Sequence, residues 1–242
     1  MKKTILAHAA ACAPAESCGY VVRTAEGEVY FPCENLSAES TVYFRMAPED
    51  FLRVQLAGEV VALVHSHPGG MPYLSEADRR LQVQSALPWW LVCEGEIRRF
   101  RCVPFLIGRT FEHGQTDCYS LFRDAYHLAG INLPDFLRED DWWKRGENLY
   151  LNNLDATGFY PVDAGDAQPG DVLICCFGSS VANHAAIYCG SGELLHHIPG
   201  QLSKRERYTD KWQRRIHSIW RHRKWHGSAF TGICNDLAAA ST

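Results

Sequence analysis

The pattern of hydrophobic and polar positions divides the chain into two successive blocks. The first block predicts helices at 4–11, 48–57 and 75–85, strands at 18–23, 28–31 and 60–64, and a closing hairpin of 89–94 and 96–102. The strand at 60–64 is short, apolar and rich in β-branched residues, which is typical of a buried strand. Pro48 suits the first turn of its helix, because the N–H that it lacks has no partner there.

A second pattern begins after Pro104. It predicts a helix at 117–129 and strands at 171–177, 184–189 and 193–198, with a long stretch rich in Trp, Asn and acidic residues in between. A chain of 242 residues is long enough for two compact domains. We therefore expect an α+β protein of two domains, 1–104 and 105–242, that ends in a frayed tail at 238–242.

Composition narrows the kinds of partner. The formal net charge is −4, which argues against a surface for nucleic acid or anionic membranes, although the stretch 204–224 is locally basic. Ten cysteines are scattered without a Cys-x-x-Cys pair, so we expect free thiols in a reducing compartment. The N-terminus imitates a signal peptide, but His8 interrupts its short apolar core and a helix is the preferred interpretation. No run of about 18 apolar residues predicts a membrane span.

The first group of candidate site residues has the spacing of a metal centre. His65 and His67 lie two apart at the end of a strand, so both side chains point to one face and can share an ion. Asp78 offers the carboxylate that completes a three-ligand zinc site, and Ser75 is the expected N-cap of its helix. Glu16 precedes the first strand and can act as the base for a zinc-bound water. Alternatively, the histidines are polar strand-end residues and Ser75 with Asp78 is only a helix cap.

Taken in order, these residues resemble the signature of the JAMM metallopeptidase family, which is a Glu, then His-x-His-Pro, then Ser-x-x-Asp. The matching segments here are Glu16, His65-Ser66-His67-Pro68 and Ser75-Glu76-Ala77-Asp78. The resemblance implies a JAMM-type αβ metallohydrolase fold with Zn²⁺ as cofactor. It also implies that His65, His67 and Asp78 bind the ion, that Glu16 is the general base and that Ser75 stabilises the oxyanion.

The second group has the order of a cysteine peptidase. Cys118 follows Asp117 at the start of a predicted helix, where the dipole favours thiolate and is expected to lower the thiol pKa. A thiolate nucleophile needs a histidine that is usually distant in sequence, and His184 begins a strand. The alternative interpretation is a packed core cysteine and an unrelated histidine at a strand edge.

The hairpin after His184 supplies a third candidate. If its loop is centred on Gly190, His184 faces His196, which could orient the imidazole. A shift of one residue makes His197 the neighbour instead. Both choices stay open at this point.

Cys118, His184 and His196, with Gly170-Asp171-Val172 leading a strand, resemble the NlpC-type family of peptidoglycan endopeptidases. That resemblance implies a papain-like fold and a Cys-His-His triad. A JAMM-type domain followed by an NlpC-type domain resembles the arrangement in the tail assembly protein K family of lambda-like phages and prophages. This resemblance implies an assembly role with tail-tip proteins as partners, peptide or stem-peptide substrates, and a place in the host cytoplasm or at the virion tail tip. The alternatives are an assembly factor that acts by binding, and a lysis enzyme, for which no wall-binding module or export signal is visible.

Overall fold

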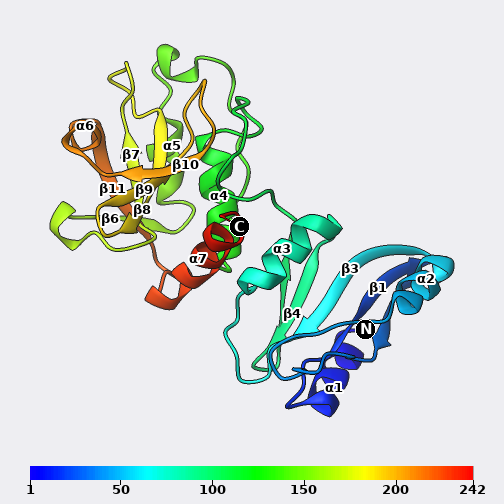
Figure 1. Cartoon of the computed structure of the whole chain (residues 1–242). Coiled ribbons are helices and arrows are strands. Elements are labelled where there is room, and N and C mark those ends of the chain that lie inside the picture. Colours follow the sequence, from blue (N-terminus) through cyan, green and yellow to red (C-terminus); the bar gives the residue numbers. More distant parts are fainter. Residues whose placement is uncertain (242) are drawn as a thin grey trace. The chain divides into compact units, whose positions relative to one another are not determined.

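The computed structural model describes residues 1–241, which separate into two compact units, unit 1 at residues 1–103 and unit 2 from residue 104 onward (Figure 1). Both units combine helices with one antiparallel-rich sheet. Unit 1 contains α1 (Lys2–Cys12), β1 (Cys18–Thr24), β2 (Gly27–Cys33), α2 (Pro48–Ala57), β3 (Glu59–Ser66), α3 (Glu76–Ser85), β4 (Trp89–Cys93) and β5 (Glu96–Phe100). The helix predicted at 48–57 is confirmed at both ends.

The sheet of unit 1 is buried on both faces, with the strand order β2-β1-β3-β4-β5. On one face, Ile5 and Ala9 of α1 pack against alternate residues of the central strands, such as Val64. On the other face, Val54 of α2 packs into a second apolar cluster with Leu63 and its neighbours. Because strand side chains alternate between faces, the apolar run of β3 serves both clusters.

β3 and β4 are parallel neighbours, and α3 connects them. Parallel strands need such a crossover, because a tight hairpin can join only antiparallel strands. The crossover begins where β3 ends, at Ser66, and α3 begins after Ser75. The carboxyl end of β3 therefore lies beside the N-terminus of α3.

Unit 2 places one six-stranded antiparallel sheet against its helices, with the strand order β10-β9-β8-β7-β11-β6. Its elements are α4 (Cys118–Leu128), η1 (Trp142–Arg145), α5 (Leu149–Leu154), β6 (Phe159–Val162), η2 (Ala164–Asp166), β7 (Val172–Cys175), β8 (His184–Gly190), β9 (Glu193–His196), β10 (Lys204–Arg207), α6 (Asp210–Gln213), β11 (Ile216–His222), η3 (Gly227–Ala229) and α7 (Phe230–Ala239). α4 packs on β8 and on α7.

The expected frayed tail at 238–242 is wrong for its first residues. α7 continues to Ala239, which is buried, while Thr242 lies outside the described residues. Gly232 explains the close approach of α7 to α4, since a Cβ there would meet the Leu128 carbonyl oxygen at 2.1 Å. Helix packing against α4 therefore stabilises a segment whose Ala-rich sequence alone gives little tertiary signal.

The hairpin register expected around His184 is also wrong. β8 and β9 pair Ile187 with Leu195 and Tyr188 with Leu194, and the register shifts between Tyr188 and Gly190. This irregularity at the turn moves His196 by two residues, opposite Ala186, so that it is a diagonal neighbour of His184 on one sheet face. Within residues 1–241, no helix is long and apolar enough to cross a membrane.

Candidate active sites

The first candidate site lies where β3 ends and α3 begins. His65 Nε2 and His67 Nε2 are 3.1 Å apart, and Asp78 Oδ2 lies 3.4 Å from the first and 3.2 Å from the second. His65 is completely buried and Asp78 nearly so. The structure thus brings the three sequence-predicted ligand residues to a single point, with one donor atom from each.

The donor set fits a metal ion. His67 Nδ1 lies 2.9 Å from the carbonyl oxygen of Met71, and this contact assigns the ring proton to Nδ1 and leaves the Nε2 lone pair toward the cluster. Two imidazole nitrogens and a carboxylate oxygen are a ligand set that zinc accepts while an open position remains. Sequence patterns gave no sign of Met71, because any residue can supply a carbonyl.

The cap of α3 orients Asp78. The Ser75 N–H donates to Asp78 Oδ2 at 2.8 Å, and the Asp78 N–H donates to Ser75 Oγ at 3.1 Å, which is a reciprocal capping box. The predicted N-cap is therefore confirmed. Since Ser75 Oγ accepts in this box, its own hydroxyl proton is free to be donated elsewhere.

Glu16 reaches the cluster through the junction between β1 and β3. The Ser17 N–H donates to Ser66 Oγ at 2.8 Å and the Ser66 N–H donates to the Ser17 carbonyl at 3.1 Å. This link places Glu16 Oε1 3.8 Å from His67 Nε2. Burial raises the pKa of the Glu16 carboxyl to about 7. Ser66, the middle residue of the His-Ser-His segment, thus ties the start of β1 to the end of β3, a role that the motif spacing did not reveal.

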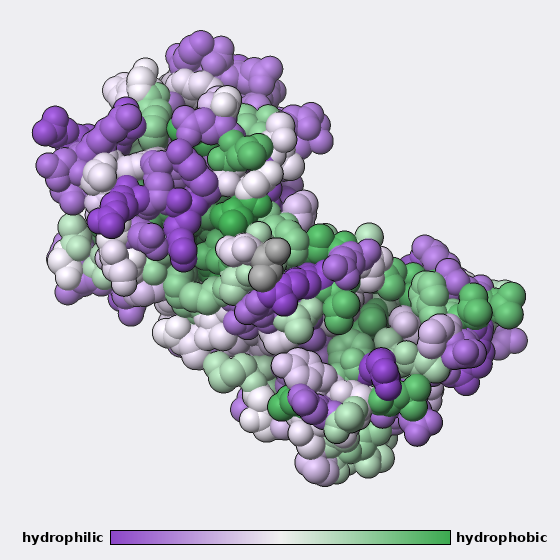
Figure 2. All heavy atoms as spheres, in the orientation of Figure 1, coloured by the Kyte–Doolittle hydropathy of each residue, from purple (hydrophilic) through white to green (hydrophobic). Residues whose placement is uncertain are grey.

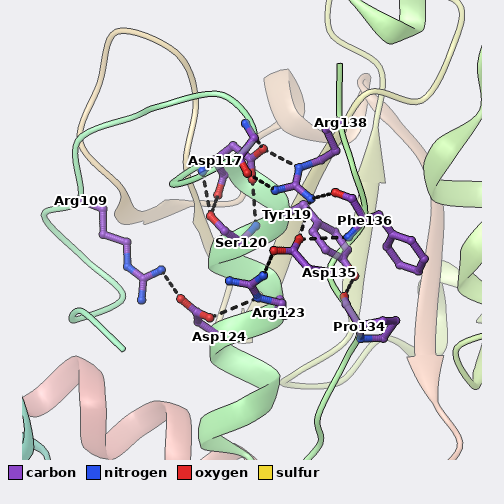
Figure 3. Close-up of polar contacts among 11 residues, drawn as sticks. Arg109, Asp117, Tyr119, Ser120, Arg123, Asp124, Pro134, Asp135, Phe136 and Arg138 are labelled. Carbon is purple, nitrogen blue, oxygen red and sulfur yellow. Dashed lines mark hydrogen bonds and ion pairs between the residues drawn. The ribbon is translucent and has the colours of Figure 1, made fainter. Parts of the chain in front are cut away.

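The second candidate site begins at the N-terminus of α4, where a polar network fixes Asp117 (Figure 3). Asp117 Oδ1 accepts from the Ser120 N–H at 2.9 Å, and the Asp117 N–H donates to Ser120 Oγ at 2.8 Å. Arg138 Nε donates to Asp117 Oδ2 at 2.7 Å, and both side chains are buried. The first turn of α4, and Cys118 within it, is therefore held by a capping box backed by an ion pair.

The surroundings of the Cys118 thiol oppose its ionisation. Burial, followed by the charge of Asp117, raises the pKa of Cys118 to about 11. This direction is opposite to the lowering that the helix start led us to expect. Cys118 Sγ lies 3.2 Å from the hydroxyl of Tyr150, which comes from α5. Tyr150 was missed because its stretch of sequence has no clear periodicity.

Cys118 and His184 line one cleft of about 560 Å³, together with Trp142, Trp143 and Phe177. Burial, followed by the charges of His196 and other neighbours, lowers the pKa of His184 to about 3. The imidazole is therefore neutral at pH 7 and can accept a proton. Within residues 1–241, no hydrogen bond joins the thiol to this ring, and His184 Nε2 has no partner.

His196 lies near His184 without bonding to it. The ring centroids are 6.1 Å apart, and Trp212 of α6 packs against both rings at 5.9 and 4.6 Å. Glu206 Oε1 is 3.3 Å from His196 Nε2, but the geometry is not that of a hydrogen bond. The ring of His197 instead packs on Phe111 at 5.1 Å. Trp212 was not singled out from the sequence, since nothing in its basic, Trp-rich stretch distinguishes it from Trp220 and Trp225.

Comparison with known families matches each unit separately. Residues 1–103 match the family of prokaryotic homologues of the JAB domain, and residues 104–221 match the NlpC/P60 family. The chain therefore has a JAB-like fold followed by an NlpC/P60 fold, as the two motif resemblances implied.

Two phage proteins match most of the chain, and a bacterial protein matches about half of it. Tail tip assembly protein K of Escherichia phage lambda is 77% identical over 197 residues, which are 81% of this chain and 99% of that protein. The protein of the same name from Escherichia phage N15 is 38% identical over 93% of this chain and 95% of its own length. A probable endopeptidase of Mycobacterium tuberculosis is 32% identical over 53% of this chain but only 28% of its own length. The chain belongs to the tail tip assembly protein K family of phages.

Proposed function

We propose that this chain takes part in phage tail-tip assembly in the host cytoplasm and hydrolyses peptide bonds at Cys118. The observation that carries the catalytic part is the shared cleft, in which Cys118 at a helix start and a neutral His184 face the same space. Membership in the tail tip assembly protein K family supports the assembly part, with tail-tip proteins as partners. The NlpC/P60 match supports peptidoglycan stem peptides as the substrate class.

In this proposal Cys118 is a neutral thiol before substrate binds. His184 takes the thiol proton as the sulfur attacks the carbonyl carbon of the scissile bond, and then returns the proton to the leaving amine. The amide N–H groups at the start of α4 have no partner within the helix and can face the developing oxyanion. His196 holds the ring of His184 from the neighbouring strand, jointly with the Trp212 ring. The thioester is then hydrolysed by water with His184 as the base.

We further propose that His65, His67 and Asp78 hold one zinc ion in unit 1. A bound zinc ion lowers the pKa of a coordinated water and polarises a carbonyl. Met71 fixes the tautomer of His67 and the Ser75 N–H fixes the Asp78 carboxylate. Glu16 is the general base that takes a proton from the water that attacks a peptide or isopeptide bond. The Ser75 hydroxyl donates a hydrogen bond to the oxyanion.

One digestion experiment tests the cysteine centre. Purified full-length chain is incubated with muropeptides, and cleavage of the stem peptide is followed by chromatography. Cys118→Ala is expected to abolish cleavage and to leave folding and zinc content unchanged, while Cys234→Ala, at an exposed cysteine far along the chain, is the matched control with full activity. Full cleavage by Cys118→Ala would remove the peptidase proposal for unit 2.

Elemental analysis tests the metal centre. Protein purified without chelator is expected to carry about one zinc per chain, as the three-ligand set requires. His67→Ala is expected to lose the metal, whereas His8→Ala, which removes a histidine of α1 outside the cluster, is expected to keep it. Unchanged zinc in His67→Ala would exclude this assignment.

A second candidate function is assembly by binding without catalysis. The observation that favours it is the high thiol pKa of Cys118 together with the missing hydrogen bond to His184. Complementation of a tail-assembly defect separates the two functions. Tail tips formed with Cys118→Ala as efficiently as with the unaltered chain would favour the binding function, and loss of infectious particles would favour catalysis.

A further inference from the structure

A second hollow of about 350 Å³ lies next to the cleft of Cys118, and Phe177 and Ile198 line both. We refer to it as the basic hollow, because cations dominate its lining. Four cationic side chains line it against one carboxylate: Lys204, Arg207, Lys211 and Arg215, with Glu206. Figure 2 shows strongly hydrophilic side chains over the part of unit 2 that holds β10 and α6, from which most of these residues come.

The one carboxylate is already engaged. Glu206 accepts from Lys204 Nζ at 2.9 Å and from Trp212 Nε1 at 2.5 Å. Arg207, Lys211 and Arg215 have no carboxylate within ion-pair distance among residues 1–241. Three cations in one hollow therefore lack a counter-charge in a chain whose net charge is −4. Such a local excess attracts anions and raises their concentration at the surface.

The basic hollow is coupled to the reaction centre. Phe177 contacts the His184 ring at 4.8 Å, and the Arg215 guanidinium lies over the same Phe177 ring at 4.6 Å. The charge of Arg215 also contributes to the low pKa of His184. Asp140 and Asp141 line the cleft of Cys118 but not the basic hollow. Carboxylates of a bound substrate are therefore favoured in the hollow and disfavoured beside the two aspartates.

We propose that the basic hollow is the subsite for a carboxylate of the peptide substrate. The inference rests on the proposed peptidase function, and it names a specificity that this function alone does not require. Peptidoglycan stem peptides are rich in free carboxylates, which a cation cluster recognises by charge-assisted hydrogen bonds. The three unpaired cations, not Glu206 or its partners, carry this selection.

Binding to full-length Cys118→Ala tests the subsite without requiring turnover. The probes are one stem peptide with free carboxylates and the same peptide with those groups amidated, measured by calorimetry at low and at physiological salt. We expect the free acid to bind about tenfold more tightly, the preference typical of one good charge-assisted contact, and to lose part of this preference at higher salt. Lys211→Gln and Arg215→Gln should each reduce the preference to less than about threefold.

Arg214→Gln is the matched control. It removes a neighbouring cation that does not line the hollow, so the preference should stay near tenfold. Equal binding of the two peptides overturns the inference, and so does a loss of preference in Arg214→Gln as large as in Lys211→Gln. Tighter binding of a short DNA duplex through Lys211, with equal binding of both peptides, also overturns it. If the unaltered chain cleaves neither peptide yet Lys211→Gln removes a measured preference, the peptidase function fails while the carboxylate subsite stands.

Discussion

The two candidate sites differ in what holds their side chains in place. In unit 1, atoms of His65, His67 and Asp78 converge within 3.1 to 3.4 Å, and His65 Nδ1 has no hydrogen-bond partner among residues 1–241. In unit 2, the start of α4 is fixed by the internal ion pair of Asp117 and Arg138, and Cys118 lines the cleft beside it. The side chains of the first site converge on a position that a bound ion could occupy. Those of the second site are held by ion pairs and hydrogen bonds within the protein.

The two sites should therefore be sensitive to different changes. Three donor atoms at one point, two of them on buried residues, gain most from a shared cation, so unit 1 should depend on a ligand for stability. A capped helix start with a buried ion pair is satisfied without a ligand, so unit 2 should depend on its own residues.

Metal removal should have the largest effect, and it should be confined to unit 1. A ligand present at about 1,000 times its Kd stabilises the folded state by about 4 kcal/mol. Chelation should therefore lower the free energy of unfolding of unit 1 by about that amount, as followed by thermal unfolding with and without a chelator. The unfolding of unit 2 should not change. His67→Ala should already be insensitive to the chelator, and an unaltered chain that also shows no shift would contradict the metal-centred description of unit 1.

Arg138→Met should have the next largest effect, on unit 2. The substitution leaves the buried Asp117 carboxylate without its cation, and breaking a buried pair in this way costs about 3 kcal/mol or more. Chemical denaturation measures the loss. Lys144→Met is the matched control, because its ion pair with Asp141 at 2.8 Å is exposed and should change stability by less than about 0.5 kcal/mol. Equal effects of the two substitutions would show that the network behind Cys118 does not hold α4.

Acid should weaken unit 2 through His184. Its pKa is about 3 in the folded chain and about 6.5 when unfolded, so the unfolded state binds the extra proton. The stabilisation is complete above pH 6.5 and is lost as the pH falls toward 3, by up to about 1.4 kcal/mol per pH unit. Denaturation of His184→Gln between pH 7 and 5 should show a shallower slope than the unaltered chain. Because His184 stays neutral to low pH, peptidase activity should begin to fall only well below pH 6. A loss of activity centred at pH 6.5 would contradict a buried His184 as the base.

The sequence predicted unit 1 better than unit 2 for a physical reason. β3, the turn after it and the cap of α3 are consecutive, so local spacing determines which side chains meet. His65, His67, Ser75 and Asp78 could all be placed from this segment. The position of Glu16 beside the histidines depends on the pairing of β1 with β3. The order of the motif implied this pairing, but the local sequence pattern did not.

In unit 2, the decisive contacts join distant segments. Arg138 meets Asp117 across an irregular stretch, Tyr150 reaches Cys118 from α5, and Trp212 packs on the histidines from α6. The sequence correctly predicted that His184 and His196 lie on the two strands of one hairpin. Their register depends on an irregularity between Tyr188 and Gly190, which the periodicity of the sequence does not encode. The partial burial of Cys118 was equally hidden, because the first turn of a helix can be open or covered.

Separating the two units should have the smallest effect. Each has its own sheet and its own apolar clusters, with Trp89 and Leu91 in unit 1 and Leu173 and Ile219 in unit 2. Fragments 1–103 and 104–242 should therefore each be soluble and unfold cooperatively, within about 1 kcal/mol of the same unit in the intact chain. Urea unfolding followed by circular dichroism measures this, with zinc present for the first fragment so that metal loss is not mistaken for loss of contacts. A fragment that folds only when the other is added would show that the units depend on each other, and the contrast between a ligand-dependent unit 1 and a self-sufficient unit 2 would then be wrong. If instead fragment 1–103 unfolds normally with zinc and fails without it, while fragment 104–242 is indifferent to zinc, the contrast belongs to the two units themselves.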